Sequence, residues 1–269
     1  MTAATPPAGQ PTVRARPGVP AATSGVGGAV LLVGIRIGLW LGVQLLLAGL
    51  LITAGAAATG QALDEAASWW MVYGALVDLG TLGVIFWLLR RDGRSYRDLL
   101  GPPTAAWQVA LGAVAVLAAS VPAVVFSAEF TSAVYGENLA PMFAVVDLPP
   151  WASVVSVLLV PLLAELAEPV AYLGVILPRL EARLGRAWLA ATVVVLVWAG
   201  EHAVYPLLTS NSGGLDWAFA VYRVGSVLPF LAIWTALYYA LGRRLLPVMA
   251  ARWVFNGGTA LALALGLVE

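Results

Sequence analysis

The sequence contains neither cysteine nor lysine, and it contains only one histidine. Without cysteine there is no disulfide framework, no thiolate nucleophile and no cysteine-ligated metal. Without lysine there is no side-chain amine to act as a general base or to form a Schiff base. A single histidine also falls short of the several imidazoles in many zinc sites. These absences exclude several common kinds of catalytic site.

Charge is scarce as well, because only 10% of the 269 residues are charged and the formal net charge is zero. Soluble domains carry roughly a quarter charged residues, whereas 61% of this chain is hydrophobic. No basic block is long enough to suggest nucleic-acid binding. The composition therefore predicts an integral membrane protein that has the lipid bilayer, and no nucleic acid, as a partner.

The first 28 residues differ from the rest, since they are rich in Pro, Ala, Thr and Gly. Such a segment has too little apolar surface to fold by itself. We do not expect a cleaved signal peptide, because the first apolar run begins too far along the chain and is too long. We predict that residues 1–28 are a disordered cytoplasmic tail and that residues 29–269 form a single transmembrane domain.

Seven stretches are apolar over the ~20 residues that a membrane-spanning helix requires. The fourth is long enough to tilt or to project beyond the bilayer. The predicted fold is therefore all-α, a polytopic membrane helix bundle with about seven transmembrane helices. The stretches are roughly 29–57, 67–89, 105–127, 150–177, 187–208, 218–241 and 248–267.

Arginine marks alternate connections between these stretches. Four Arg lie in 90–101, three in 178–186, two in 242–247 and two in the tail, whereas the opposite connections have acidic residues and no Arg. Because positively charged loops stay in the cytoplasm, these eleven of the fourteen Arg are expected inside. The prediction is a multi-pass protein of the cell membrane with a cytoplasmic N-terminus and an external C-terminus.

A few polar residues remain within the predicted spans. Each ionisable group at mid-membrane costs about 2.5 kcal/mol or more, so such groups usually pair or face a wet cavity. Arg36 lies near the inner end of its span, and we expect it to extend to the cytoplasmic surface. Asp78 is deeper, and Arg36 and Arg223 are its candidate partners. The full set is Arg36, Asp78, Glu165, Glu168, Glu201, His202, Arg223, Arg252 and Asn256.

Three of the predicted helices carry polar residues at overlapping depths. Glu165 and Glu168 are spaced i, i+3, and Arg252 and Asn256 are spaced i, i+4, so each pair shares a helix face. With a rise of about 1.5 Å per residue, these residues and His202 reach similar levels if the fourth span tilts. Trp198, one turn before His202, would lie beneath the imidazole.

Such a pocket suits the activation of water. A carboxylate and an imidazole can polarise a water molecule, while an amide and a cation stabilise the oxyanion on an attacked carbonyl. This chemistry is peptide hydrolysis without a covalent intermediate. The same residue types also serve as hydrogen-bonding contacts between membrane helices, and spacing alone leaves both interpretations open.

Three segments resemble the motifs of the CPBP family, which comprises CAAX-processing endopeptidases and bacteriocin-related intramembrane proteases. That family has Glu-Glu-x-x-x-Arg-Gly, Phe-x-x-x-His and His-x-x-x-Asn on three membrane helices. The segments 168–185, 198–202 and 240–256 follow in this order, within a family-like core at 150–267. The resemblance implies that Glu168 is the base and His202 its partner.

The third motif keeps Asn256, which the resemblance makes an oxyanion donor, but has Arg252 in place of histidine. An arginine near Glu168 would favour the ionised carboxylate and could occupy the oxygens that hold water. It could equally serve as an oxyanion donor with a fixed charge. Because this cation would repel a divalent metal ion, we expect no metal and no other cofactor.

The first motif also departs from the family pattern. Pro169 stands where the second glutamate is expected, and Leu173 stands in place of the arginine. Trp198 replaces the phenylalanine of the second motif. Glu165 and Glu201 are the candidates to replace the missing carboxylate in charge, although neither lies at a motif position.

Three hypotheses for function follow. The first is a CPBP-like intramembrane protease that cuts a membrane-embedded peptide or protein. The second, motivated by the departures from the motifs, is a catalytically degenerate homologue that binds or scaffolds membrane proteins. The third is a transporter of protons or small solutes with Asp78, Glu165 and Arg223 as a relay, which lacks the paired broken half-helices common in transporters.

Overall fold

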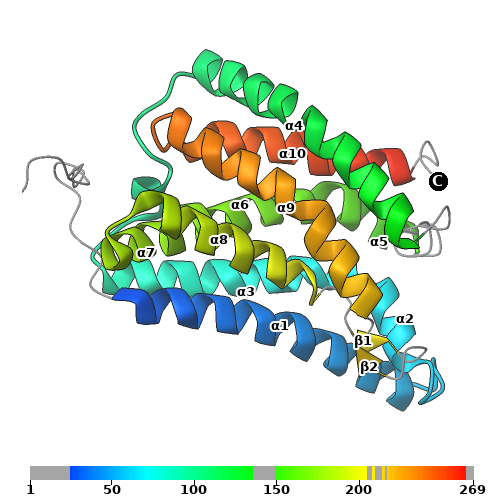
Figure 1. The fold of residues 1–269 in the computed structure, drawn as a ribbon. Coiled ribbons are helices and arrows are strands. Elements are labelled where there is room, and N and C mark those ends of the chain that lie inside the picture. Colours follow the sequence, from blue (N-terminus) through cyan, green and yellow to red (C-terminus); the bar gives the residue numbers. More distant parts are fainter. Residues whose placement is uncertain (1–24, 136–148, 205–207, 210–213, 216, 265–269) are drawn as a thin grey trace, which may run out of the picture.

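The computed structural model describes residues 25–135, 149–204, 208–209, 214–215 and 217–264 (Figure 1). Helix α1 begins at Gly25, four residues before the predicted start of the first span. Residues 1–24 of the predicted tail lie outside the described part of the chain. The all-α helix bundle is confirmed, and a two-residue antiparallel pairing of β1 (Leu208–Thr209) with β2 (Gly214–Leu215) accompanies it.

Within the described residues, five helical stretches are long and apolar enough to cross a membrane, and they coincide with predicted spans one to four and six. Helix α8 is apolar but has only 16 residues and ends at His202, earlier than the predicted end at 208. Helix α10 has 20 residues. The long and short helices outside the fourth span are α1 (Gly25–Thr53), α2 (Ala62–Ser68), α3 (Trp70–Arg91), η1 (Tyr96–Leu99), α4 (Ala106–Tyr135), α8 (Ala187–His202), α9 (Trp217–Ala240) and α10 (Leu245–Ala264).

The fourth span is one long helical stretch in which α-helical and π-helical segments alternate. Pro169 ends α6 and lacks the backbone N–H that a regular turn would use, and the π segment η5 starts directly after it. A widened turn of this kind often accompanies a functional site. The segments are α5 (Pro150–Val154), η4 (Val155–Leu159), α6 (Val160–Pro169), η5 (Val170–Ile176) and α7 (Leu177–Leu184).

The helices pack so that the fourth span lies inside the bundle. Helix α1 packs on α3 and α3 packs on α6, while α4 packs on both α9 and α10. In Figure 1, α1 and α3 lie on one side, α4 and α10 on the other, and α6, α8 and α9 lie between them. The fourth, fifth and seventh spans therefore meet in the interior, where the predicted site residues are.

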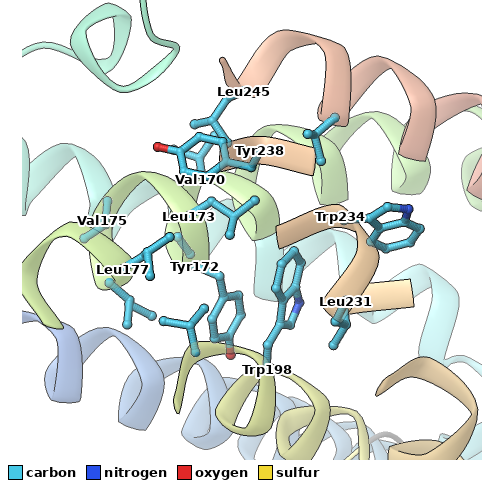
Figure 2. Close-up of a cluster of buried hydrophobic side chains, with 14 of the residues drawn as sticks. Val170, Tyr172, Leu173, Val175, Leu177, Trp198, Leu231, Trp234, Tyr238 and Leu245 are labelled. Atoms are coloured by element: carbon cyan, nitrogen blue, oxygen red, sulfur yellow. The ribbon is translucent and has the colours of Figure 1, made fainter. Parts of the chain in front are cut away.

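The largest apolar core surrounds the π segment η5. Tyr172, Leu173 and Trp198 are completely buried there (Figure 2). Leu173 occupies the motif position at which the family has arginine. In this chain an arginine at that position would be surrounded by apolar side chains, which is unfavourable without a charged partner.

The three Arg-rich connections lie close together at one end of the bundle. Arg179 pairs with Asp92, and Arg243 pairs with Glu181 at 2.6 Å. The backbone N–H of Leu245 also donates to the carbonyl of Leu100. Gly101 permits this approach, because a Cβ atom there would lie 2.7 Å from the Arg243 carbonyl oxygen.

Candidate functional site

A cavity of about 470 Å³ is lined by residues of α1, α3, α4, α6, α8, α9 and α10. All four residues predicted for the site, Glu168, His202, Arg252 and Asn256, line it. They come from α6, α8 and α10, so the expected convergence of three helices is present. Three further charged residues line the same cavity, namely Arg36, Asp78 and Arg223.

Glu168 is buried and is held through both carboxylate oxygens. Its Oε1 accepts a hydrogen bond of 2.6 Å from Trp198 Nε1, and its Oε2 lies 2.5 Å from Arg252 Nη2. The Nε2 atom of His202 lies 3.6 Å from Oε1. Glu168 and His202 therefore face each other at slightly more than hydrogen-bonding distance.

The orientation of His202 is set by its own helix. Its Nδ1 atom lies 2.9 Å from the carbonyl oxygen of Trp198. A carbonyl oxygen only accepts, so Nδ1 must carry the proton of this hydrogen bond. In the neutral ring, Nε2 then carries the lone pair that faces Glu168.

Arg252 is fixed between two glutamates and two aromatic rings. Its Nε donates to Glu165 Oε2 at 2.8 Å, while Nη2 contacts Glu168. Its guanidinium carbon lies 5.0 Å from the ring centre of Trp198 and 4.6 Å from that of Trp234. Such contacts between a cation and aromatic faces are favourable, so the arginine in place of the motif histidine is part of a built ionic cluster.

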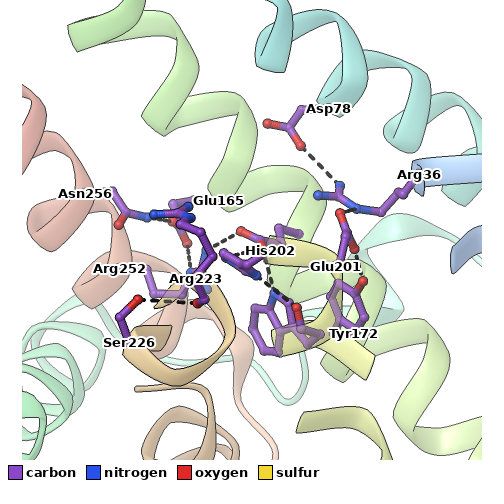
Figure 3. A network of polar contacts seen from close by, with 12 residues as sticks. Arg36, Asp78, Glu165, Tyr172, Glu201, His202, Arg223, Ser226, Arg252 and Asn256 are labelled. Carbon is purple, nitrogen blue, oxygen red and sulfur yellow. Dashed lines mark hydrogen bonds and ion pairs between the residues drawn. The ribbon is translucent and has the colours of Figure 1, made fainter. Parts of the chain in front are cut away.

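Asn256 belongs to the same cluster. Its Nδ2 donates to Glu165 Oε1 at 2.7 Å, and Figure 3 shows Asn256 beside Glu165. Glu165 is not among the residues that line the cavity, although it contacts two that do. It supplies a second carboxylate to Arg252.

A second ionic cluster adjoins the first. Arg36 donates to Glu201 at 2.7 Å, to Asp78 at 3.2 Å and to Thr81 at 3.1 Å (Figure 3). Tyr172 donates to Glu201 from the other side. The predicted pairing of Asp78 with Arg36 is confirmed.

The expectation that Arg36 extends to the cytoplasmic surface is wrong. The residue is 1% exposed, because two carboxylates in the interior hold its guanidinium. Glu201 faces Arg36, so it does not replace the missing carboxylate beside Glu168. Of the residues in the transporter hypothesis, Asp78 and Arg223 line the cavity, whereas Glu165 is bonded to Arg252 and Asn256.

The role of Trp198 is not apparent from the motif alone. Its ring stacks on Tyr172 with centres 4.8 Å apart, its edge donates to Glu168, and Arg252 lies over its face. The family has phenylalanine here, which lacks the N–H. The exchange of Phe for Trp is the one sequence signal that could have indicated an added hydrogen bond.

The site offers poor ligands for a metal ion. Within the part of the chain that the structure describes, no group of three or more His, Asp and Glu side chains is arranged to hold a metal. The oxygens of Glu165 and Glu168 are engaged by Arg252. A guanidinium at this position opposes the approach of a hard divalent cation.

Comparison with protein families gives a match to the model described as type II CAAX prenyl endopeptidase Rce1-like, over residues 150–258. Comparisons with curated proteins and with solved structures gave no match. The matched segment contains all three motif segments up to Asn256 and covers less than half of the chain. Together with the five apolar helices, the match indicates an integral membrane protein that carries an Rce1-like domain, consistent with the CPBP family that its motifs resemble.

Proposed function

We propose that this protein is an intramembrane endopeptidase, which hydrolyses a peptide bond in a membrane-embedded peptide or protein. One observation carries the proposal: Glu168 and His202 face each other across 3.6 Å at the wall of a cavity that Arg252 and Asn256 also line. A gap slightly longer than a hydrogen bond, between two polar groups, is where a water molecule is commonly shared.

The proposed reaction begins with a water molecule in contact with Glu168 and His202. Its oxygen attacks the carbonyl carbon of the substrate, and a proton of the water passes to the Glu168–His202 pair. The negative charge that develops on the carbonyl oxygen is stabilised by hydrogen-bond donors of Asn256 and Arg252. The carbon–nitrogen bond then breaks, and the nitrogen leaves after it has gained a proton.

The surrounding contacts support a fixed geometry for this step. Trp198 and Arg252 hold the two oxygens of Glu168, and the helix backbone holds His202 through Nδ1. A catalytic pair held by a second set of contacts keeps its orientation without rearrangement during the reaction. Each of the four predicted site residues then has a defined role in the proposed reaction.

We further propose that the N-terminus is cytoplasmic and the C-terminus external in the cell membrane. The support is that the Arg-rich connections meet at one end of the bundle through the Arg179–Asp92 and Arg243–Glu181 ion pairs. Basic connections remain on the cytoplasmic side. Protease protection of tags at the two termini in sealed vesicles tests this orientation directly.

A second candidate function is a non-catalytic protein that binds other membrane proteins. The observation in its favour is that both oxygens of Glu168 already accept hydrogen bonds, from Trp198 and from Arg252. A carboxylate that is paired with an arginine is a weaker base than one that contacts only water. Under this alternative Glu168 and Arg252 serve stability and shape alone.

The experiment that separates the two candidates is cleavage of a membrane-embedded peptide library by the purified protein in proteoliposomes. The endopeptidase hypothesis predicts cleavage by the wild type, and its loss in Glu168→Gln and His202→Ala. Glu129→Gln is the matched control, because this glutamate is exposed on α4 and is not among the residues that line the cavity. A wild type that cleaves no peptide, while Glu168→Gln lowers only the thermal stability, would establish the non-catalytic alternative.

A further inference from the structure

The buried charges around the cavity do not balance. Within the described residues, four carboxylates and three guanidinium groups line the cavity or contact its lining, and each of these residues is less than 10% exposed. The ion pairs at the Arg-rich end balance among themselves. An uncompensated negative charge at this depth is strongly unfavourable, so the group as a whole should retain one extra proton. The seven residues are Asp78, Glu165, Glu168, Glu201, Arg36, Arg223 and Arg252.

The hydrogen-bond donors around each carboxylate indicate where this proton resides. Glu168 accepts from Trp198 and Arg252, Glu165 accepts from Arg252 and Asn256, and Glu201 accepts from Arg36 and Tyr172. These contacts stabilise the ionised form. Asp78 has one such contact among the described residues, with Arg36.

This contact is also the weakest of its kind. At 3.2 Å it is the longest of the ion pairs between arginine and a carboxylate in the described structure. Arg36 already donates to Glu201 at 2.7 Å, so its charge is shared. Because the same guanidinium holds both carboxylates, Glu201 is a negative charge close to Asp78, which favours a neutral carboxyl group at Asp78.

His202 is the other group that could hold the proton. Its Nε2 faces the carboxylate of Glu168 at 3.6 Å. Because Arg252 already compensates this carboxylate, a second cation at His202 is less favourable than a neutral Asp78.

Asp78 is also placed to reach a substrate. Met71, Gly74 and Asp78 follow one face of α3 and all line the cavity that Glu168 and His202 line from α6 and α8. Arg36 bonds to Oδ1 of Asp78. In Figure 3, Asp78 lies beside Arg36, whereas Asn256 and Arg252 lie on the other side of His202. Donors for the carbonyl oxygen and an acid for the nitrogen are thus found on different sides of His202.

We propose that Asp78 is a neutral carboxylic acid and the catalytic acid of this cavity, which protonates the leaving nitrogen. This inference rests on the proposed endopeptidase function. As the carbon–nitrogen bond breaks, its electron pair passes to the nitrogen, which takes the proton of Asp78. The aspartate so formed is stabilised by Arg36, and the proton that the Glu168–His202 pair took from water returns to Asp78 before the next cycle.

The first test measures protonation without reference to activity. Infrared spectra of the wild type in lipid should contain the C=O stretching band of a carboxylic acid, which an ionised carboxylate lacks. The band should disappear in Asp78→Asn and persist in Glu129→Gln, which removes an exposed carboxylate that does not line the cavity and leaves the buried charges unchanged. A band that survives Asp78→Asn, or a wild type without the band, would overturn the inference.

The second test separates an acid from a merely structural residue. Asn is close to Asp in size and keeps a hydrogen-bond donor, but it cannot give up a proton. Asp78→Asn should lower kcat for a peptide bond about 10²- to 10⁴-fold and leave KM nearly unchanged. With an ester whose leaving group needs no proton, the loss should largely vanish.

The outcomes separate this inference from the proposed function. Equal losses for the peptide and the activated ester would show that Asp78 acts only on structure, which overturns the acid role. A wild type that cleaves peptides but lacks the infrared band refutes the inference about Asp78 and leaves the endopeptidase standing. A wild type that has the band but cleaves neither substrate refutes the endopeptidase and, with it, the acid role.

Discussion

The two buried ionic clusters have the same composition but different surroundings. Each contains one arginine between two carboxylates: Arg252 with Glu165 and Glu168, and Arg36 with Asp78 and Glu201. In the first cluster both carboxylates accept two hydrogen bonds from described residues. In the second cluster only Glu201 does, and Asp78 has one contact, from Arg36.

This difference separates two tasks. The first cluster lies entirely on helices of the matched segment 150–258 and holds the proposed base in one orientation. The second joins that segment, through Glu201, to α1 and α3, which precede it in the chain. Under this proposal, the cluster with fewer hydrogen-bond donors holds and releases a proton at Asp78. The more fully bonded cluster fixes the orientation of Glu168.

The largest difference between the clusters should appear when each arginine is replaced. Arg252→Met leaves two ionised glutamates buried without a cation, so it should lower the free energy of unfolding by about 3–5 kcal/mol. Arg36→Met leaves one ionised carboxylate, Glu201, next to a neutral Asp78, and should cost clearly less. Thermal unfolding in one detergent measures both. Equal losses would contradict the different charge states assigned to the two clusters.

The next effect lies within the first cluster and concerns activity. Glu168→Gln should reduce peptide cleavage about 10²- to 10⁴-fold, because a carboxamide cannot accept the proton of water. Glu165→Gln should leave most cleavage intact, since Glu165 does not line the cavity. Initial rates in proteoliposomes provide the comparison. If Glu165→Gln abolished cleavage as completely as Glu168→Gln, the result would contradict the role of Glu168 as the base.

A smaller effect on stability is expected at Trp198. Trp198→Phe restores the aromatic residue of the motif and keeps the ring, but it removes the donor to Glu168. Loss of a hydrogen bond to a charged group should cost about 1.5–3 kcal/mol. Chemical denaturation in detergent measures this cost, and an unchanged midpoint would show that the bond contributes little to the first cluster.

The smallest effect should occur outside both clusters, at the Arg-rich end. Tyr239 donates to Glu181 at 2.6 Å, and Arg243 contacts the same carboxylate twice. Tyr239→Phe removes one of several donors, so it should cost only about 0.5–1.5 kcal/mol. Cleavage rates should not change, because Tyr239 is remote from the residues that line the cavity. A large loss of activity would show that this end of the bundle is coupled to the site.

The order and type of the helices could be predicted from the sequence because long apolar runs determine them. The positions of the ends were less accurate, as at Gly25 and His202, since apolar residues continue past His202 and the small residues before Ala29 also fit a helix. The convergence of Glu168, His202 and Asn256 could also be predicted, because helical spacing and the motifs both favour it.

The partners of the buried charges could not be predicted in the same way. Arg36 was expected at the surface, and only the packing of α1 against α3 and the turn of Glu201 toward it explain its burial. The bridge that Arg252 makes between Glu165 and Glu168 depends on the relative depth of two helices. Helix spacing within one segment does not specify contacts across segments, so these pairings require the three-dimensional structure.

The central claim is that Glu168, facing His202, activates water for attack on a peptide bond. The most direct measurement is cleavage of a membrane-embedded peptide in ¹⁸O-labelled water, with mass spectrometry of the new C-terminal fragment. The account predicts one labelled oxygen in the new carboxyl group with the wild type and no product with Glu168→Gln. Labelled product that forms as readily with Glu168→Gln as with the wild type, or no cleavage by either protein, would contradict it.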